Sequence, residues 1–375
     1  MGNGELGIGD FPDRYSLRKP ILSLFVIIPC SFLLLGASQN PQSPAPITNS
    51  ELNEQLNIPL NNGTQGELRD EADRLVRLGG QSKRQGNLDK AIPYWWQAIK
   101  IYHQIGDIEA VGRVYDFVGL AYAELGDYQR AEDYLRRRLG YARENKDTVG
   151  QIIGLNNIGT ILLKRGSYPA ARTTFEDALT IARSIENTEG IGLSLNNLGL
   201  AAYGVNEYNQ AIVFYEEALI YRNRSGDAIG QANTLNNLGD AYRAKDPQAP
   251  YGSRNFRDTI GVYGAALAVS RSSLDLPNQY RAIDALVQIY CDVKLFTRAY
   301  DLLDRRLAIS QSEENPRQEL KTLQTLAGVY QAEGRYEDAR NAYQRAIAVA
   351  RVLKDTHAES ILLGQVIDLP KEPGF

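Results

Sequence analysis

Between residues 67 and 350, apolar positions recur with the spacing of amphipathic helices. In one representative segment they follow i, i+3, i+4 and i+7: Leu155, Ile158, Gly159 and Leu162. Gly166 comes next, and glycine can adopt the left-handed conformation that ends a helix. A second apolar stripe then begins: Tyr168, Ala171, Phe175, Ala178 and Leu179. The segment therefore predicts two helices joined by a short turn.

This helix pair recurs with a period of 40 residues. Glycines mark the same local frame in five units: Gly79, Gly119, Gly159, Gly199 and Gly239. Two later units keep the frame without the glycine, around Val287 and Ala327. Self-similarity at a fixed period of this size indicates a stacked array, in which each unit buries its apolar face against its neighbours. Seven units over residues 67–350 therefore predict an all-α protein.

The unit resembles the tetratricopeptide repeat, a helix–turn–helix with Gly, Tyr, Ala, an aromatic residue and Ala at these offsets. Its period is longer than that of the usual repeat, and is similar to the long-helix repeats of kinesin light chain and of adaptors that bind polarity proteins. Those repeats also carry the Asn-Asn or Asn-Leu-Gly found here, as in Asn196-Asn197-Leu198-Gly199. The resemblance implies a right-handed α–α superhelical solenoid whose first helices line a concave face.

The first 66 residues are different in character. A basic segment ending at Lys19 precedes an apolar run from Ile21 to Ala37, and small residues follow up to Ser38. This order is typical of a secretory signal peptide over residues 1–38, with a retained membrane anchor as the alternative. We therefore expect an exported protein, either periplasmic or anchored facing outward. Residues 39–66 are rich in Gln, Asn, Pro and Ser, and predict a disordered linker.

Two departures from the repeat occur near the C-terminus. The turn between Tyr242 and Phe256 gains eight residues, an insertion that either contacts a partner or is a neutral loop. Residues 351–375 predict a capping helix and a tail. The capping helix would cover the last apolar face with one more first-helix stripe: Ser360, Leu363, Val366 and Ile367.

Composition argues against several kinds of chemistry. A net charge of −4, spread along the array, argues against a nucleic-acid partner. Two histidines and two cysteines leave little for metal binding or nucleophilic catalysis, so we predict no metal, no cofactor and no enzymatic activity. Cys291 is expected to be a packing residue. The charged clusters Arg136-Arg137-Arg138 and Asp304-Arg305-Arg306 fall on second helices, where a solvated outer face is the expected environment.

The candidate binding residues follow from helix geometry. If the recurrent glycine is position 8 of each first helix, positions 2, 6, 9 and 13 point away from the apolar stripe. Residues selected at these positions are Arg77, Arg113, Asn157, Lys164, Asn197, Asn233, Asn237, Asp240, Arg281 and Lys321. The asparagines at position 6 could pair with the main chain of an extended peptide, because an amide both donates and accepts. The families that the chain resembles have such an asparagine ladder. Alternatively, these amides bond between adjacent helices and stiffen the stack, a role better suited to Asn156, Asn196 and Asn236 at position 5.

These observations predict a non-enzymatic scaffold or adaptor that holds an extended segment of a client protein. Positive side chains outnumber negative ones at the inward positions, so a neutral or mildly acidic segment is the expected ligand. One alternative is a sensor or regulatory module that responds to a small peptide. Another is a periplasmic assembly factor for a photosynthetic membrane complex. This alternative rests on a resemblance in overall organisation, an export signal followed by repeats, and not on a diagnostic motif.

Overall fold

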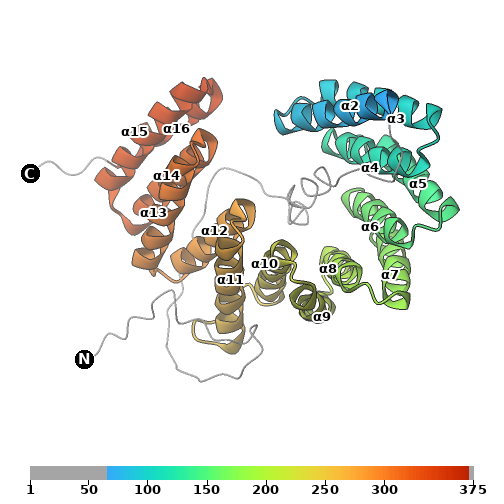
Figure 1. Ribbon diagram of the computed structural model, residues 1–375. Helices are drawn as coiled ribbons and strands as arrows, with labels where there is room; N and C mark the ends of the chain where they lie inside the picture. The colour runs from blue at the N-terminus through green and yellow to red at the C-terminus, as the bar shows by residue number, and fades with distance from the viewer. Residues whose placement is uncertain (1–65, 371–375) are drawn as a thin grey trace, which may run out of the picture. The chain divides into compact units, whose positions relative to one another are not determined.

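The computed structural model describes residues 66–370, and over that range the chain is entirely helical, with fifteen helices, α2 to α16 (Figure 1). The predicted signal segment, residues 39–65 of the predicted linker and residues 371–375 lie outside the described residues. None of the helices in the described range is long and apolar enough to cross a membrane.

Along the chain, the first and second helices of the repeat alternate seven times, and one final helix follows. The first helices are α2 (Glu67–Arg84), α4 (Ile108–Glu124), α6 (Thr148–Lys164), α8 (Thr188–Gly204), α10 (Ala228–Lys245), α12 (Leu276–Asp292) and α14 (Pro316–Glu333). The second helices are α3 (Leu88–Gln104), α5 (Tyr128–Glu144), α7 (Tyr168–Ser184), α9 (Tyr208–Ser225), α11 (Arg254–Ser272), α13 (Phe296–Ser312) and α15 (Tyr336–Leu353). The final helix is α16 (Thr356–Asp368). The predicted all-α array with a final helix is confirmed. The apolar stripe predicted for that final helix is wrong for Ser360, Leu363 and Ile367, which are exposed, because Leu362 is the residue buried against α15.

The chain divides into two compact units, with the division after Lys245. The N-terminal unit contains α2 to α10, and the C-terminal unit contains α11 to α16. The eight-residue insertion of the sequence lies at this division, since α10 ends at Lys245 and α11 begins at Arg254. The regular period therefore breaks where one compact unit gives way to the next.

Within the N-terminal unit, consecutive helices pack on one another, and first helices also contact the first helix of the next pair. These additional contacts join α4 to α6, α6 to α8 and α8 to α10. Figure 1 shows α4, α6, α8 and α10 on the inner side of the curve of this unit, with α5, α7 and α9 outside them. The first helices therefore form one continuous layer.

The recurrent glycines allow the two helices of a pair to approach closely. A Cβ at Gly159 would overlap the ring of Phe175, and one at Gly199 would overlap the ring of Tyr215. In the sixth unit Val287 takes the place of the glycine, and the smaller Leu303 takes the place of the aromatic residue. Here the larger valine of the first helix faces the smaller leucine of the second, although other units differ, as Gly119 with Leu135 does.

Aspartate or asparagine begins almost every first helix. The side chains at these N-caps accept the backbone N–H three residues later: Asp107, Asp147, Asn187, Asp227, Asp275, Asn315 and Asp355. This bond satisfies one of the backbone donors that the first turn of a helix leaves without an intrahelical acceptor. The caps fix where each unit begins.

Candidate binding surface of the first helices

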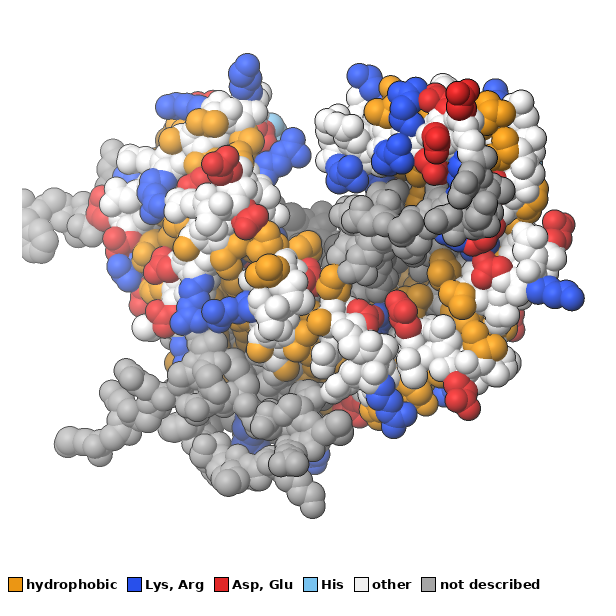
Figure 2. Space-filling model, viewed as in Figure 1, with side chains coloured by type: hydrophobic (Ala, Val, Ile, Leu, Met, Phe, Trp, Pro, Cys, Tyr) orange, Lys and Arg blue, Asp and Glu red, His pale blue; other side chains and the backbone are white. Residues whose placement is uncertain are grey.

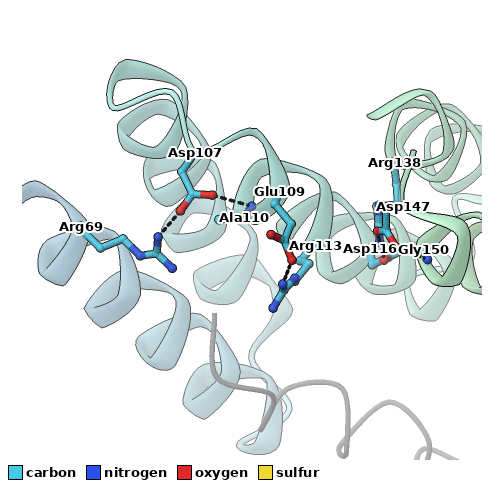
Figure 3. A network of polar contacts seen from close by, with 9 residues as sticks. All are labelled: Arg69, Asp107, Glu109, Ala110, Arg113, Asp116, Arg138, Asp147 and Gly150. Atoms are coloured by element: carbon cyan, nitrogen blue, oxygen red, sulfur yellow. Dashed lines mark hydrogen bonds and ion pairs between the residues drawn. The ribbon is translucent and has the colours of Figure 1, made fainter. Parts of the chain in front are cut away.

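Of the three cations predicted to bind a ligand in the N-terminal unit, two are exposed to solvent. Arg77 on α2 and Lys164 on α6 are exposed. Arg113 on α4 is half-buried and forms an ion pair with Glu109 of its own helix (Figure 3). Figure 2 shows basic and acidic side chains interspersed over the described surface of this unit, rather than gathered by sign.

Asp240 on α10, the acidic residue among the predicted binding residues, is half-buried. In the C-terminal unit, Arg281 on α12 is also half-buried. Lys321 on α14 is 58 % exposed, and its Nζ lies 2.6 Å from Oδ2 of Asp284 on the preceding first helix. A ligand of Lys321 would therefore compete with this ion pair.

The asparagines at position 6 were predicted to pair with the main chain of a peptide. That prediction is wrong for Asn197 and Asn237. Both side chains are buried, as is that of Asn233, while Asn157 is half-buried. The side-chain amide of Asn197 donates to Oδ1 of Asn156 at 2.9 Å, and its own oxygen accepts from Asn196. Its hydrogen-bonding groups are thus used between helices.

One contact repeats along the first-helix layer. The position-6 amide of each unit donates to the position-5 side chain of the unit before it: Asn157 to Asp116 at 3.2 Å, Asn197 to Asn156 at 2.9 Å, and Asn237 to Asn196 at 2.9 Å. Asn156 also donates to Ser194, and Asn196 also accepts from Thr234. We call this series the inter-repeat ladder. The inter-helix role predicted for Asn156 and Asn196 is confirmed.

The Asn196 side chain forms hydrogen bonds with Asn197, Thr234 and Asn237, so we expect its replacement to be costly. Asn196→Ala removes an acceptor shared by Thr234 and Asn237, and should lower the free energy of unfolding by about 1–3 kcal/mol. Urea denaturation measures the effect. The exposed Asn223→Ala on α9 is the control, and it should be neutral or slightly stabilising. Equal effects of the two changes would contradict the ladder.

Two arginines that the sequence assigned to a solvated face are buried. Arg138 on α5 and Arg306 on α13 are almost fully inaccessible, so that prediction is wrong for the last residue of each cluster. They take the place held by alanine in other second helices: Ala98, Ala178, Ala218, Ala266 and Ala346. Arg138 Nε donates to Asp116 at 3.0 Å, and Arg306 Nε lies 3.2 Å from Asp284.

The acids that pair with these arginines are part of the same layer. Asp116 and Asp284 occupy position 5, where Asn156 and Asn196 stand in the units whose second helix carries alanine. An acid in the first helix therefore accompanies an arginine in the second, and an amide accompanies an alanine in every unit but the first, which has Val76 with Ala98. This correlation within one chain is the signal by which sequence reasoning could have found the buried ion pairs.

Figure 3 shows how Arg138 links three helices. Its guanidinium reaches Asp116 on α4, and also Asp147, 3.1 Å away, which caps α6 by accepting from Gly150. A Cβ at Gly150 would overlap both the guanidinium and the Asp147 carboxylate, so glycine makes room for the bridge. Arg69 on α2 binds the cap of α4, Asp107, in a similar way.

Comparison with known families gives three matched segments. The family model described as tetratricopeptide repeat matches residues 71–144, 151–219 and 280–351, together more than half of the chain. The chain belongs to the tetratricopeptide repeat family. No curated protein sequence matches it.

Several solved tetratricopeptide repeat structures are similar in fold. One is a signal transduction ATPase with numerous domains that carries a tetratricopeptide repeat sensor, from Pyrococcus horikoshii: TM-score 0.55, 17% identity, covering 78% of this chain and 44% of that one. Another is a Rap protein complexed with competence and sporulation factor. Its TM-score is 0.52 and its identity 13%, and the match covers 85% of this chain and 91% of that one. A third is the Rap conjugation gene regulator of plasmid pLS20 in complex with the Phr* peptide. Its TM-score is 0.50 and its identity 15%, and the match covers 80% of this chain and 81% of that one. At these identities the likeness shows the fold, and this chain spans less than half the length of the ATPase.

Metal binding needs clustered ligands, and nucleophilic catalysis needs a reactive side chain. Residues 66–370 contain no group of three or more His, Cys, Asp or Glu side chains that could hold a metal ion. Burial raises the pKa of the Cys291 thiol to about 12, so it stays protonated and is a poor nucleophile. Burial also raises the pKa of the Asp116 carboxyl, and Arg138 opposes that rise. For both Cys291 and Asp116, burial is the main cause of the shift.

Proposed function

We propose that this tetratricopeptide repeat protein is a non-enzymatic binding module that holds an extended peptide, or an extended segment of a client protein, against its first helices. The fold is generally one of interaction scaffolds, and it presents a continuous layer of first helices in the N-terminal unit. The proposal includes export from the cytoplasm, for which the predicted signal segment over residues 1–38 is the support.

The observation that carries the proposal is the balance of available charge on α2, α4 and α6. The acids at the inward positions already have cationic partners in the structure, Asp73 with Arg69 and Glu124 with Lys83. By contrast, exposed cations on these helices have no ion-pair partner among the described residues: Arg77, Arg84 and Lys164. Because the acids are neutralised and the cations are not, this surface favours a neutral or acidic ligand.

The proposal is tested with short fluorescein-labelled peptides that are acidic, neutral or basic and otherwise alike. We expect fluorescence anisotropy to give the tightest binding for the acidic peptide, with a dissociation constant on the order of micromolar. Arg77→Glu together with Lys164→Glu should weaken that binding about tenfold or more, because two attractive charges become repulsive.

The matched control is Lys90→Glu together with Lys100→Glu, which makes the same change of charge on the second helix α3, where both lysines are exposed. This pair should leave binding within about twofold, since net charge alone acts weakly at a distance under physiological salt. Equal weakening by the two pairs would contradict a site on the first helices, and no binding of any peptide would contradict the proposed function.

A second candidate function is a peptide-responsive sensor. It is favoured by the fold neighbours, one of which is described as carrying a tetratricopeptide repeat sensor and another as bound to the Phr* peptide. Small-angle X-ray scattering separates the two candidates. A scattering profile that changes when a peptide binds supports a sensor, and an unchanged profile supports a module that only holds its ligand.

A further inference from the structure

Helix α16 repeats the buried pattern of a first helix. Leu363 corresponds in frame to residues that are buried in the earlier first helices: Leu155, Leu195, Leu235, Ile283 and Leu323. Ile367 corresponds to the recurrent glycine position, which is equally buried: Gly159, Gly199, Gly239, Val287 and Ala327. By sequence, α16 is therefore the first helix of an eighth unit.

The face that a second helix covers in other units is open on α16. Leu363 is 42 % exposed and Ile367 is 78 % exposed, whereas Leu362 on the opposite side is buried against α15. The described residues contain no second helix after α16. Ser360 lies on the same face, one turn before Leu363, and with Leu363 and Ile367 it forms what we call the open face of α16.

The inter-repeat ladder does not continue here. Gly364 stands at the position held by Asp116, Asn156 and Asn196, and the space beside it is empty of protein atoms within 4 Å. A helix that packs on α16 therefore meets no buried polar group in need of a partner. The open face carries no charge, and small residues at 360 and 364 let another backbone approach closely.

We propose that the open face of α16 binds the same face of a second copy of this chain, as an antiparallel helix pair around a twofold axis. The face is apolar and uncharged, so two copies bury it without bringing like charges together. First helices already pack directly against first helices elsewhere in this chain, as α6 does against α8. This proposal is independent of the proposed function.

The charges beside the open face are complementary in this arrangement. His357 and Asp368 are both exposed, and because they are eleven residues apart they lie on the same flank of α16, near its two ends. In an antiparallel pair, each His357 comes next to Asp368 of the second copy. The imidazole N–H can donate to that carboxylate. In a parallel pair the two equal flanks would lie on opposite sides of the contact, so His357 and Asp368 would not meet.

Sedimentation velocity of the full-length chain over micromolar concentrations tests the proposal. The wild type should form a dimer, and Ile367→Lys should raise its dissociation constant about 100-fold or more, because two buried side chains are replaced by charges. The control is Val213→Lys on α9, which changes another exposed apolar residue in the same way and should leave the dimer intact. Ile367 is exposed near the C-terminal end of α16, where lysine is compatible with the helix.

A monomeric wild type would overturn the proposal. A dimer unaffected by Ile367→Lys, or lost equally in Val213→Lys, would also overturn it.

The orientation is tested by charge exchange: His357→Asp should weaken the dimer about fivefold, and adding Asp368→His should restore it. Failure to restore would rule out the antiparallel pair.

Discussion

Replacing Arg138 by alanine is expected to lower the free energy of unfolding by about 3–5 kcal/mol, because the change leaves the buried carboxylate of Asp116 without its cation. Asn157 remains as a hydrogen-bond donor to that carboxylate, but it carries no charge. The variant also loses the bond from Arg138 to the cap of α6, Asp147. Urea denaturation followed by circular dichroism measures the loss.

The neighbouring Arg137 supplies the control. Its side chain is exposed and pairs with the exposed Asp133, so Arg137→Ala should cost no more than about 1 kcal/mol. A similar cost for Arg137→Ala and Arg138→Ala would show that burial of the ion pair does not determine its contribution.

A second substitution should restore most of the stability. Asp116→Asn combined with Arg138→Ala reproduces the amide and alanine that the next unit carries at Asn156 and Ala178. Because no buried charge then remains unpaired, the double variant should be clearly more stable than Arg138→Ala alone. A double variant as unstable as the single one would contradict the correlation of acid with arginine and amide with alanine.

The pH dependence of the Arg138→Ala variant follows from the same carboxylate. Burial raises the pKa of Asp116, and Arg138 opposes that rise, so its removal should raise the pKa further. The folded variant then binds a proton more readily than the unfolded chain does, and its stability falls as pH rises through the folded pKa. Its deficit relative to the wild type should therefore shrink as the pH is lowered below neutrality.

Gly199→Val is expected to lower the free energy of unfolding by about 3 kcal/mol. The new side chain would overlap the ring of Tyr215, which is fully buried and cannot move aside without disturbing α8 and α9. Thermal and urea denaturation measure the effect. Gly140→Val in α5 is the control, because no atom lies near that glycine and the change should stay within about 0.5 kcal/mol of the wild type.

A compensating change distinguishes crowding from a loss of helix propensity. The sixth unit combines Val287 with Leu303, so Gly199→Val together with Tyr215→Leu should recover part of the stability. If the double variant is less stable than Gly199→Val, then packing at this position is not set by the sizes of these two residues.

Much of the fold could be predicted from the sequence alone. The helix pairs, their number and the buried stripe with Gly159 and Gly199 follow from contacts within one unit and with its nearest neighbour. Such contacts leave a periodic record in the chain, because every unit meets the same steric requirement. The same reasoning selected Arg77 and Lys164, which the structure leaves exposed.

Only the tertiary structure decided how the polar side chains are used. A helical wheel identifies the side of a helix that faces away from its partner, but it does not show that the first helix of a neighbouring unit packs there. For this reason Asn197 and Asn237 were assigned to a peptide, although they bond to Asn156 and Asn196, which are 41 residues earlier. The burial of Arg138 and the exposure of Ile367 depend likewise on which helices are packed beside them. Periodicity specifies each repeat, and the contacts between repeats determine which of its groups remain available to a partner.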